Sequence, residues 1–369
     1  MSGAPTPAWV QRLRAHPLLW PLVTLVLILA VNASLNPGFW SLQWRDGHLY
    51  GSVIDILNRA APLMLVALGM TLVIATRGID ISVGAVVAIS ASVAALMVGG
   101  TLVINNGVAS HVSRFPMPLA IVCALLAALA CGLWNGLLVT RLGLQPIIAT
   151  LILMVAGRGI AQLLTGGQIV TVYYAPYFYL GSGYLFGLPF ALFIALAVFG
   201  LVHLAVSRTA LGLFIQAIGI NPAAARLAGV RERLISICVY AFCGLTAGVA
   251  GLIISSNVKS ADGNNAGNLM ELDAILAVTL GGTLLTGGRF SLAGSLVGAL
   301  IIQTLTSTIY SIGVAPEINL VVKASVVFVV MMLQSAEFRR ALHGWVVRPN
   351  ARPDVRAHTS PSPERGGSL

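Results

Sequence analysis

The chain has 369 residues, of which 57% are hydrophobic and only 9% are charged. Soluble domains carry roughly 25% charged residues, so this composition excludes an ordinary water-soluble globular protein and indicates one embedded in a lipid bilayer. The net charge of +10 is explained by basic residues in loops on one side of the membrane and gives no argument for nucleic-acid binding.

The apolar segments predict an all-α polytopic membrane protein. A span needs roughly 20 apolar residues, and the chain offers about ten candidates. Some are short or interrupted by glycine, most clearly 79–98, 271–287 and 290–309, so about eight or nine full spans is an alternative. The candidate spans are 18–35, 60–76, 79–98, 118–140, 146–165, 189–206, 234–255, 271–287, 290–309 and 318–335.

Both ends of the chain are polar. Residues 1–17 predict a short cytoplasmic lead, and no small-residue cleavage site follows the first apolar stretch, so we expect a retained first span. Residues 346–369 are rich in proline, serine and arginine, which predicts a disordered cytoplasmic tail. Between them, 18–345 reads as one transmembrane domain.

Arginine placement predicts the orientation of the spans. Cytoplasmic loops carry the excess of basic residues, and a cytoplasmic N-terminus puts most arginines on that side. Both termini and the polar segment 207–233 then lie in the cytoplasm. The arginines on that side are Arg12, Arg14, Arg77, Arg141, Arg208, Arg226, Arg231, Arg233, Arg289, Arg339 and Arg340, with four more in the tail after residue 345.

Two glycine-rich segments resemble each other at an offset of 210 residues. Ala67, Thr76, Gly78 and Gly84 align with Ala277, Thr286, Gly288 and Gly294. Internal repeats are common in transporters, and shared small-residue composition is the other explanation.

Three polar residues in or beside the spans each allow a structural and a functional interpretation. Asp80 suits a helix N-cap after a cytoplasmic turn, or solute binding. Asn135 suits a hydrogen bond between helices, or a ligand contact. Arg158 suits snorkelling or pairing with a neighbouring helix, or contact with solute.

The segment 207–233 contains a very short helix with its own end signals. Asn221 suits the N-cap, Pro222 the first helical position, and Gly229 the residue after the end. The body 222–228 is about two turns, too short to be stable alone in water. We therefore expect it to dock against another protein in the cytoplasm.

The outer segment 256–268 is unusually polar for this chain. It reads either as a solvated hairpin between spans or as an element that enters the mouth of a transport path. A path for a neutral, hydroxyl-rich solute would use amide, hydroxyl and a few charged groups. The candidates are Asn58, Thr71, Asp80, Asn135, Arg158, Gln162, Asn264, Asn265, Asp273 and Gln303.

The sequence carries no recognised catalytic or nucleotide-binding motif. It lacks G-x-x-x-x-G-K-[ST], G-x-S-x-G and H-E-x-x-H, so we predict a protein that is not an enzyme and binds no cofactor. The stretch 164–168, LTGGQ, looks like an ABC ATPase signature but stands at the end of a span, and we interpret it as coincidence. The cysteines show no C-x-x-C spacing and are interpreted as apolar packing residues rather than metal ligands: Cys123, Cys131, Cys238 and Cys243.

Three motifs together resemble the ribose-type ABC importer permeases. The stretch from Gly212 to Gly229 resembles their cytoplasmic coupling segment, and that from Thr71 to Gly84 resembles their second-to-third span signature. The third motif runs from Glu271 through the glycines at 281–288. A narrower resemblance, to the galactofuranose permeases of this family, rests on 46–51, 54–62 and 261–267. Arg77 departs from the pattern, which has glycine there, and so does the tail.

The resemblance implies an ABC importer permease fold in the bacterial inner membrane, with a periplasmic sugar-binding protein, a cytoplasmic ABC ATPase that hydrolyses ATP, and a second permease subunit. It implies that the short helix couples ATPase movement to the spans. The residues this assigns to coupling are Gly219, Asn221, Pro222, Ala224, Ala225, Arg226 and Gly229.

Other functions remain open on the sequence. Within the same class, the solute could be ribose, another pentose or a small polar solute such as a branched-chain amino acid. An ion-coupled secondary carrier is disfavoured because Asp80 and Asp273 stand near span ends rather than at the midplane. A structural membrane scaffold is the third class.

Overall fold

The computed structural model describes residues 18–45, 47–105, 108–313 and 316–334. Contacts divide the chain into two compact units, 1–324 and 325–369. The described part is mostly helical, which agrees with the predicted all-α class. The predicted lead 1–17 and tail 346–369 lie outside the described residues.

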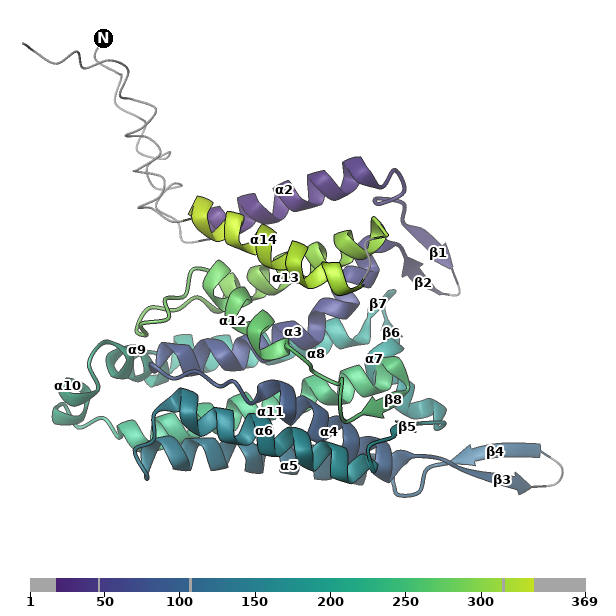
Figure 1. Cartoon of the computed structure of the whole chain (residues 1–369), viewed down its shortest axis with the longest axis horizontal. Coiled ribbons are helices and arrows are strands. Elements are labelled where there is room, and N and C mark those ends of the chain that lie inside the picture. Colours follow the sequence, from purple (N-terminus) through teal and green to yellow (C-terminus); the bar gives the residue numbers. More distant parts are fainter. Residues whose placement is uncertain (1–17, 46, 106–107, 314–315, 335–369) are drawn as a thin grey trace, which may run out of the picture. The chain divides into compact units, whose positions relative to one another are not determined.

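The first half of the chain contains the helices α2 (Leu19–Leu35), α3 (Ser52–Ala75), α4 (Val83–Val98), α5 (Met117–Thr140) and α6 (Pro146–Thr165). Short hairpins lie between them, β1 (Gln43–Arg45) with β2 (His48–Tyr50) and β3 (Thr101–Asn105) with β4 (Val108–Val112). After α6 come β5 (Ile169–Thr171), the 3-10 helix η1 (Ala175–Phe178), α7 (Tyr179–Ser182), β6 (Tyr184–Leu185) and β7 (Leu188–Pro189) (Figure 1).

The second half contains α8 (Phe190–Arg208), α9 (Leu211–Ile220), α10 (Pro222–Leu227), α11 (Glu232–Val258), α12 (Met270–Leu280), α13 (Leu292–Ser311) and α14 (Pro316–Gln334). The strand β8 (Ser260–Asp262) follows α11 and pairs antiparallel with β5, with Ile169 opposite Asp262. This pairing joins two distant parts of the chain.

Among the described residues, six helices are long and apolar enough to cross a membrane: α3, α5, α6, α8, α11 and α13. Shorter apolar helices are α2, α4, α9 and 320–329 within α14. The prediction of about ten spans is therefore not confirmed by helix length. Two candidate spans were predicted to be longer than the helices that the structure shows. The segment 79–98 begins as helix only at Val83, and 271–287 ends as helix at Leu280.

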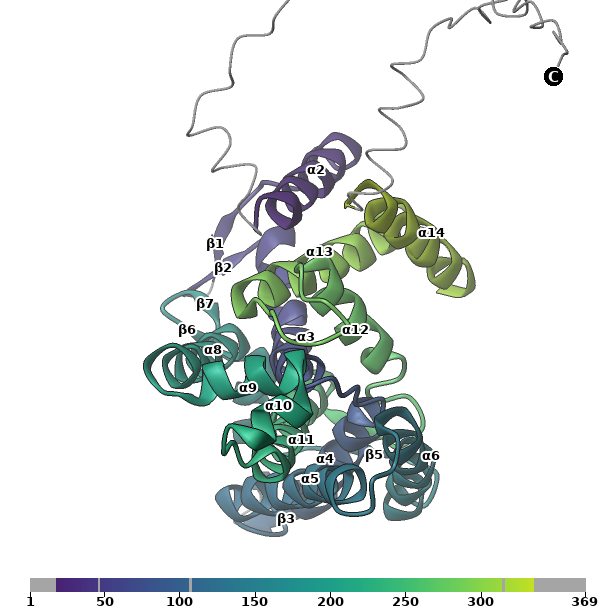
Figure 2. The ribbon, with the colours of Figure 1, turned by 90° about the vertical axis from the view of Figure 1, so that its left-hand side faces the viewer.

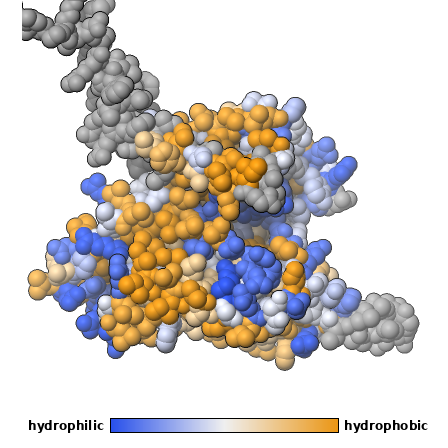
Figure 3. Space-filling view, viewed as in Figure 1, coloured by the Kyte–Doolittle hydropathy of each residue, from blue (hydrophilic) through white to orange (hydrophobic). Residues whose placement is uncertain are grey.

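Burial separates the inner helices from the outer ones. The apolar window of α3 is 89% buried and that of α11 is 67% buried, whereas those of α5 and α8 are each 22% buried. Helices with large exposed apolar surface are stable where that surface meets lipid. Figure 3 shows hydrophobic side chains over much of one face, with hydrophilic ones at the end where Figure 1 places α10 and also toward the opposite end.

Glycine permits the close contact between α5 and α11. A Cβ on Gly244 of α11 would lie 2.6 Å from the Ala128 carbonyl and 2.9 Å from Gly132 Cα, both in α5. Two backbones can approach this closely only where neither helix carries a side chain at the contact. This supports helix packing as the explanation for at least these glycines.

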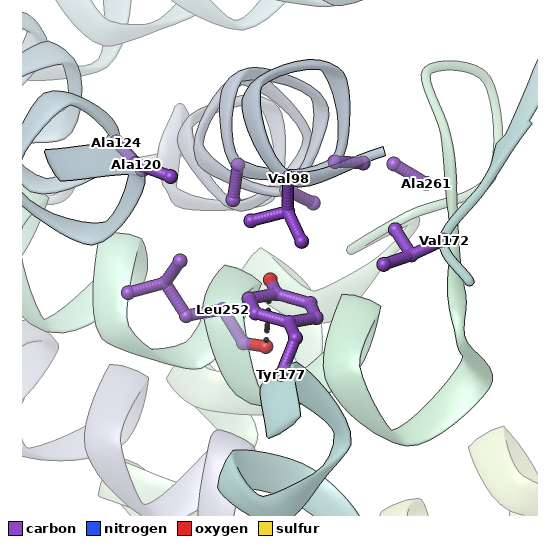
Figure 4. Close-up of a cluster of buried hydrophobic side chains, with 10 residues drawn as sticks. Val98, Ala120, Ala124, Val172, Tyr177, Leu252 and Ala261 are labelled. Atoms are coloured by element: carbon purple, nitrogen blue, oxygen red, sulfur yellow. Dashed lines mark hydrogen bonds between the residues drawn. The ribbon is translucent and has the colours of Figure 1, made fainter. Parts of the chain in front are cut away.

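A small core fixes the ends of α4, α5 and α11 next to the β5–β8 pair. Tyr177 of η1 is fully buried beside Val98, and its hydroxyl donates to the Leu252 carbonyl at 3.4 Å (Figure 4). The same hydroxyl lies 2.6 Å from Ser255 Oγ. A buried tyrosine hydroxyl needs such partners, so this ring anchors the segment between α6 and α7 to α11.

The cysteines are free thiols spread over three environments. Cys243 is buried, Cys123 and Cys131 are partly buried, and Cys238 is exposed on α11. Cys243 fits the interpretation of a packing residue, whereas Cys238 lies on the exposed face of its helix.

Candidate functional site

The short helix α10 has the end structure that its sequence predicts. Asn221 has an extended backbone, and its Oδ1 accepts hydrogen bonds from the amides of Ala223 and Ala224, both at 3.1 Å. Pro222 occupies the first turn, and Gly229 has a φ of +84°. Capping of the first amides and a left-handed glycine after the last turn define both ends of this helix.

The surface of α10 is open. Ala224, Arg226 and Gly229 are exposed, Ala225 is 5% exposed, and Leu227 is 91% exposed. Arg226 turns back to α11, with its Nη2 2.7 Å from Glu232 Oε2. Figure 2 shows α9 and α10 at the end of the helices that faces the viewer. A helix this short with an exposed leucine is a plausible contact surface for a partner protein.

Next to the α9–α10 connection, three segments meet in backbone contact, and we name them the α10 junction: Ala75–Arg77, Gly219–Ile220 and Gly287–Gly288. The Gly288 amide donates to the Ala75 carbonyl at 2.9 Å. A Cβ on Gly219 would collide with the Ala75 carbonyl and with Gly288. Gly219, a predicted coupling residue, is therefore required to be glycine by contact with these two segments.

A buried polar group joins α5 to the segment before α4. Asp80 Oδ1 accepts from Ser82 N at 3.0 Å and from Ser82 Oγ at 2.6 Å, and Asn135 Nδ2 lies 3.2 Å from the same oxygen. The N-cap position of α4 is Ser82, so the interpretation of Asp80 as N-cap was wrong. Its carboxylate instead closes a turn two residues long. Asn135 was predicted to bond to another helix; its partners lie instead in the segment just before α4.

Arg158 holds residues 263–266 against α6. Its Nη1 donates to the carbonyls of Ala266 at 2.7 Å, Asn264 at 3.2 Å and Gly263 at 3.4 Å. The predicted pairing was with a neighbouring helix, whereas these carbonyls belong to the turn after β8. Both β8 and Arg158 fix this part of the segment 256–268.

Asp262 shapes the turn that carries Asn264 and Asn265. Its Oδ1 accepts from Asn264 N at 2.8 Å, and its Oδ2 accepts from Asn265 Nδ2 at 2.7 Å. Burial raises the pKa of Asp262, but the hydrogen bonds from Asn265 and Asn264 outweigh it, so the pKa lies below its ordinary value. Both asparagines are exposed.

The remaining path candidates lie on separate helices. Asp273 pairs with Lys323 Nζ at 2.6 Å, and Thr71 Oγ1 donates to Ser295 Oγ at 2.7 Å, which joins α3 to α13. Asn58, Gln162 and Gln303 are partly buried in α3, α6 and α13. The structure thus brings together Asp80 with Asn135, and Arg158 with 264–265. It does not gather all ten candidates at one place, and their role in a path stays a prediction.

Sequence reasoning missed Glu271 and the role of Arg77. Glu271 is 3% exposed at the start of α12, and a Cβ on Gly84 would collide with its Oε2. Its signal was available, because a carboxylate at the start of an apolar segment is costly unless its surroundings use it. Within the described residues, no three or more His, Cys, Asp or Glu side chains are placed to hold a metal ion.

Known proteins match most of the chain. Residues 52–332 match the family model described as branched-chain amino acid transport system / permease component. The galactofuranose transporter permease protein YtfT of Escherichia coli (strain K12) is 49% identical over 330 residues, covering 88% of this chain and 93% of the relative.

Two further relatives extend this comparison. The fructose import permease protein FruF of Bifidobacterium longum (strain NCC 2705) is 39% identical, covering 89% of this chain and 90% of the relative. The ribose import permease protein RbsC of Escherichia coli (strain K12) is 34% identical, covering 89% and 95%. No solved structure matches the chain. With a family model over more than half its length and relatives of this identity and coverage, the chain belongs to the family of ABC transporter permease components.

Proposed function

We propose that this chain is the membrane-spanning permease subunit of an ATP-driven importer that carries galactofuranose into a bacterial cell. The observation that carries the proposal is the 49% identity over 330 residues to a galactofuranose transporter permease. The relatives named for fructose and ribose, at 39% and 34% identity, support a sugar as the solute in general. Among the alternatives, a branched-chain amino acid has only the family description behind it.

The proposed arrangement is a multi-pass protein of the inner membrane with about ten spans, some of them short or broken. Its parts would be a lead at 1–17, a permease domain at 18–345 with the coupling segment 207–233, and a tail at 346–369. Both termini lie in the cytoplasm. The basic residues at the ends of α5 and α8, Arg141 and Arg208, support this orientation because they lie on the same side as α10 in the predicted topology.

The proposed partners are a cytoplasmic ABC ATPase, a periplasmic sugar-binding protein and a second permease subunit. This chain binds no cofactor of its own, and the ATPase hydrolyses ATP. Closure of the ATPase would displace α10, whose exposed surface includes Ala224 and Leu227. The displacement would pass into the spans through the coupling residues and switch the sugar path between its outward and inward forms.

The path would use hydrogen bonds rather than charge, because a furanose is neutral and rich in hydroxyl groups. Charged groups near the spans support this, since several are already engaged within the protein. Arg158 holds backbone carbonyls, and Asp273 is paired with Lys323. Asn58 offers an amide oxygen that is buried and has no hydrogen-bond partner among the described residues, which suits a hydroxyl donor.

Calorimetry on the partner sugar-binding protein tests the solute. Galactofuranose, ribose, fructose and leucine are titrated separately into the purified protein, and each saturated form is then added to the reconstituted transporter while ATP hydrolysis is measured. We expect galactofuranose to bind tightest and to stimulate hydrolysis most. Preference for ribose or fructose at both steps would replace the assigned sugar, and stimulation by leucine alone would reject a sugar importer.

A further inference from the structure

Arg77 has a backbone conformation that residues with a side chain rarely adopt. It lies between α3 and α4 with a φ of +64°. The left-handed region is disfavoured for every L residue with a Cβ, whereas glycine enters it freely. Such a conformation persists only where surrounding contacts hold it, so the contacts of Arg77 indicate its role.

The guanidinium of Arg77 forms a hydrogen bond with the connection between α9 and α10. Its Nη2 donates to the Ile220 carbonyl at 2.6 Å. Ile220 is the last residue of α9, where carbonyls lack donors within the helix and the helix dipole is negative. The next residue, Asn221, caps α10. A cation therefore holds the peptide group about which α10 would turn relative to α9.

The third segment of the α10 junction packs against the same arginine. A Cβ on Gly287 would lie 2.6 Å from Arg77 Cγ and 3.2 Å from the Gly219 carbonyl. The Gly288 amide donates a hydrogen bond to the carbonyl of Ala75, the last residue of α3. The α3–α4 connection, the α9–α10 connection and the α12–α13 connection therefore touch through backbone atoms, with little compressible side chain between them.

We propose that Arg77 is a positioning residue that makes α10 move as one body with the α3–α4 and α12–α13 connections. A displacement of α10 is then transmitted directly to the first residues of α4 and α13, and not only through α11. This rests on the proposed function, in which the ATPase moves α10. The charge-assisted bond to Ile220 is what resists separation of α10 from the other two connections.

Three variants separate this role from a general structural one. Arg77→Gly removes the guanidinium but supplies the residue that suits the left-handed conformation. Arg77→Lys keeps the positive charge but replaces the planar guanidinium with an ammonium group, whose donors have a different geometry. Arg114→Gln is the control, because Arg114 is an exposed arginine just before α5 and outside the α10 junction. Each is measured in the complete transporter, in proteoliposomes, as sugar imported per ATP hydrolysed, with ATPase binding and melting temperature recorded alongside.

We expect Arg77→Gly to melt no lower than the wild type and to bind the ATPase normally, while sugar imported per ATP falls at least about fivefold, the lower range of coupling between sites. Arg77→Lys recovers part of the yield, and Arg114→Gln matches the wild type. An unchanged yield in Arg77→Gly, or an equal loss in Arg114→Gln, overturns the proposal.

A distance measurement tests the junction without using any sugar. Spin labels are placed on Leu227 of α10 and Leu284 of the α12–α13 connection, which are 91% and 58% exposed, in a background with Cys238→Ala. In the wild type we expect the same label distance in the nucleotide-free and the nucleotide-trapped transporter. In Arg77→Gly the distance should differ between these states. A wild-type distance that changes as much as that of the variant overturns the proposal.

Together the two experiments distinguish an error in the assigned sugar from an error in the role of Arg77. If the wild type imports no galactofuranose but the label distances behave as expected, the assigned sugar is wrong and the role of Arg77 stands. If galactofuranose is imported with equal ATP yield by the wild type and Arg77→Gly, the assigned sugar stands and the role of Arg77 is wrong.

Discussion

Asn135 Nδ2 lies 2.8 Å from Ser82 Oγ and 3.2 Å from Asp80 Oδ1, so a single amide on α5 fastens the segment that precedes α4. All three side chains are at most 1% exposed. Donors to a buried carboxylate contribute more than ordinary hydrogen bonds, because their loss leaves a polar group without compensation. This contact is one of those that determine where α4 begins.

Replacement of Asn135 tests that relationship. Asn135→Leu keeps a side chain of similar size but removes both hydrogen bonds, and we expect it to lower the free energy of unfolding by about 1–3 kcal/mol. Asn135→Gln is the control, because it retains the amide on a longer arm. Unfolding is followed in detergent by denaturant titration. Equal stability of Asn135→Leu and the wild type would show that Asp80 and Ser82 hold this turn by themselves.

Removal of the α10 cap should weaken ATPase docking. Asn221→Ala removes the acceptor for the Ala223 and Ala224 amides, and loss of such a cap costs about 1 kcal/mol. In so short a helix this melts much of the docking surface, so the affinity for the ATPase should fall roughly fivefold. Asn221→Asp retains an acceptor and should bind nearly as the wild type. Equal affinities for all three would show that α10 does not need to be preformed.

The contact between α5 and α11 gives a pair of glycine variants with opposite expectations. Gly244→Leu places a side chain where the Ala128 carbonyl and Gly132 lie, so we expect a melting temperature lower by several degrees or failure to fold. Gly159→Ala on α6 meets nothing within 4 Å and should raise helix stability by about 0.5–1 kcal/mol. Melting temperature in detergent distinguishes them. A tolerated Gly244→Leu would show that these helices separate without loss of stability.

The turn at Asp262 should depend on pH. The folded-state pKa of Asp262 is lowered, so its ionised form contributes stability that is present above the ordinary pKa of the side chain and is lost as the pH falls through the folded value. Acidification below about pH 4 should therefore loosen the segment around Asn264 and Asn265. Hydrogen exchange of the 260–268 amides, expressed as protection relative to an unstructured peptide at the same pH, measures this. In Asp262→Asn the same amides should be less protected at neutral pH, and acidification should change their protection little. Protection in the wild type that is unchanged by acidification would contradict the assigned turn.

Local signals were sufficient to predict some parts of the structure. The ends of α10 follow from Asn221, Pro222 and Gly229 because capping depends on neighbours a few residues apart. Long apolar runs likewise predicted α3, α5, α6, α8, α11 and α13. The start of α4 and the end of α12 were predicted at the wrong residues. Contacts with segments far away in the sequence determine where these helices begin and end. Asp80 turns toward Asn135, and the glycines after α12 pack on Ala75 and Gly219.

The candidate site could likewise be predicted from the sequence only in part. Its coupling residues could be named from the sequence, and the structure places Asn221 and Gly219 where a capping or close-contact role requires them. The partners of Arg158, Asp273 and Arg77 could not be named. Each is far away in the sequence, and in two cases it is a backbone carbonyl, which carries no residue-specific signal. The two segments that resemble each other in sequence at an offset of 210 residues meet at the α10 junction, through Ala75 and Gly288.

Uptake of labelled galactofuranose into proteoliposomes that contain the permease, its ATPase and the sugar-binding protein tests the central claim most directly. We predict uptake that requires ATP on the ATPase side, survives dissipation of the ion gradients by an uncoupler, and is reduced in Asn221→Ala in step with its roughly fivefold lower affinity for the ATPase. Uptake that stops with the uncoupler while ATP remains, or that proceeds without the ATPase, would contradict the account and assign the chain to ion-coupled carriers.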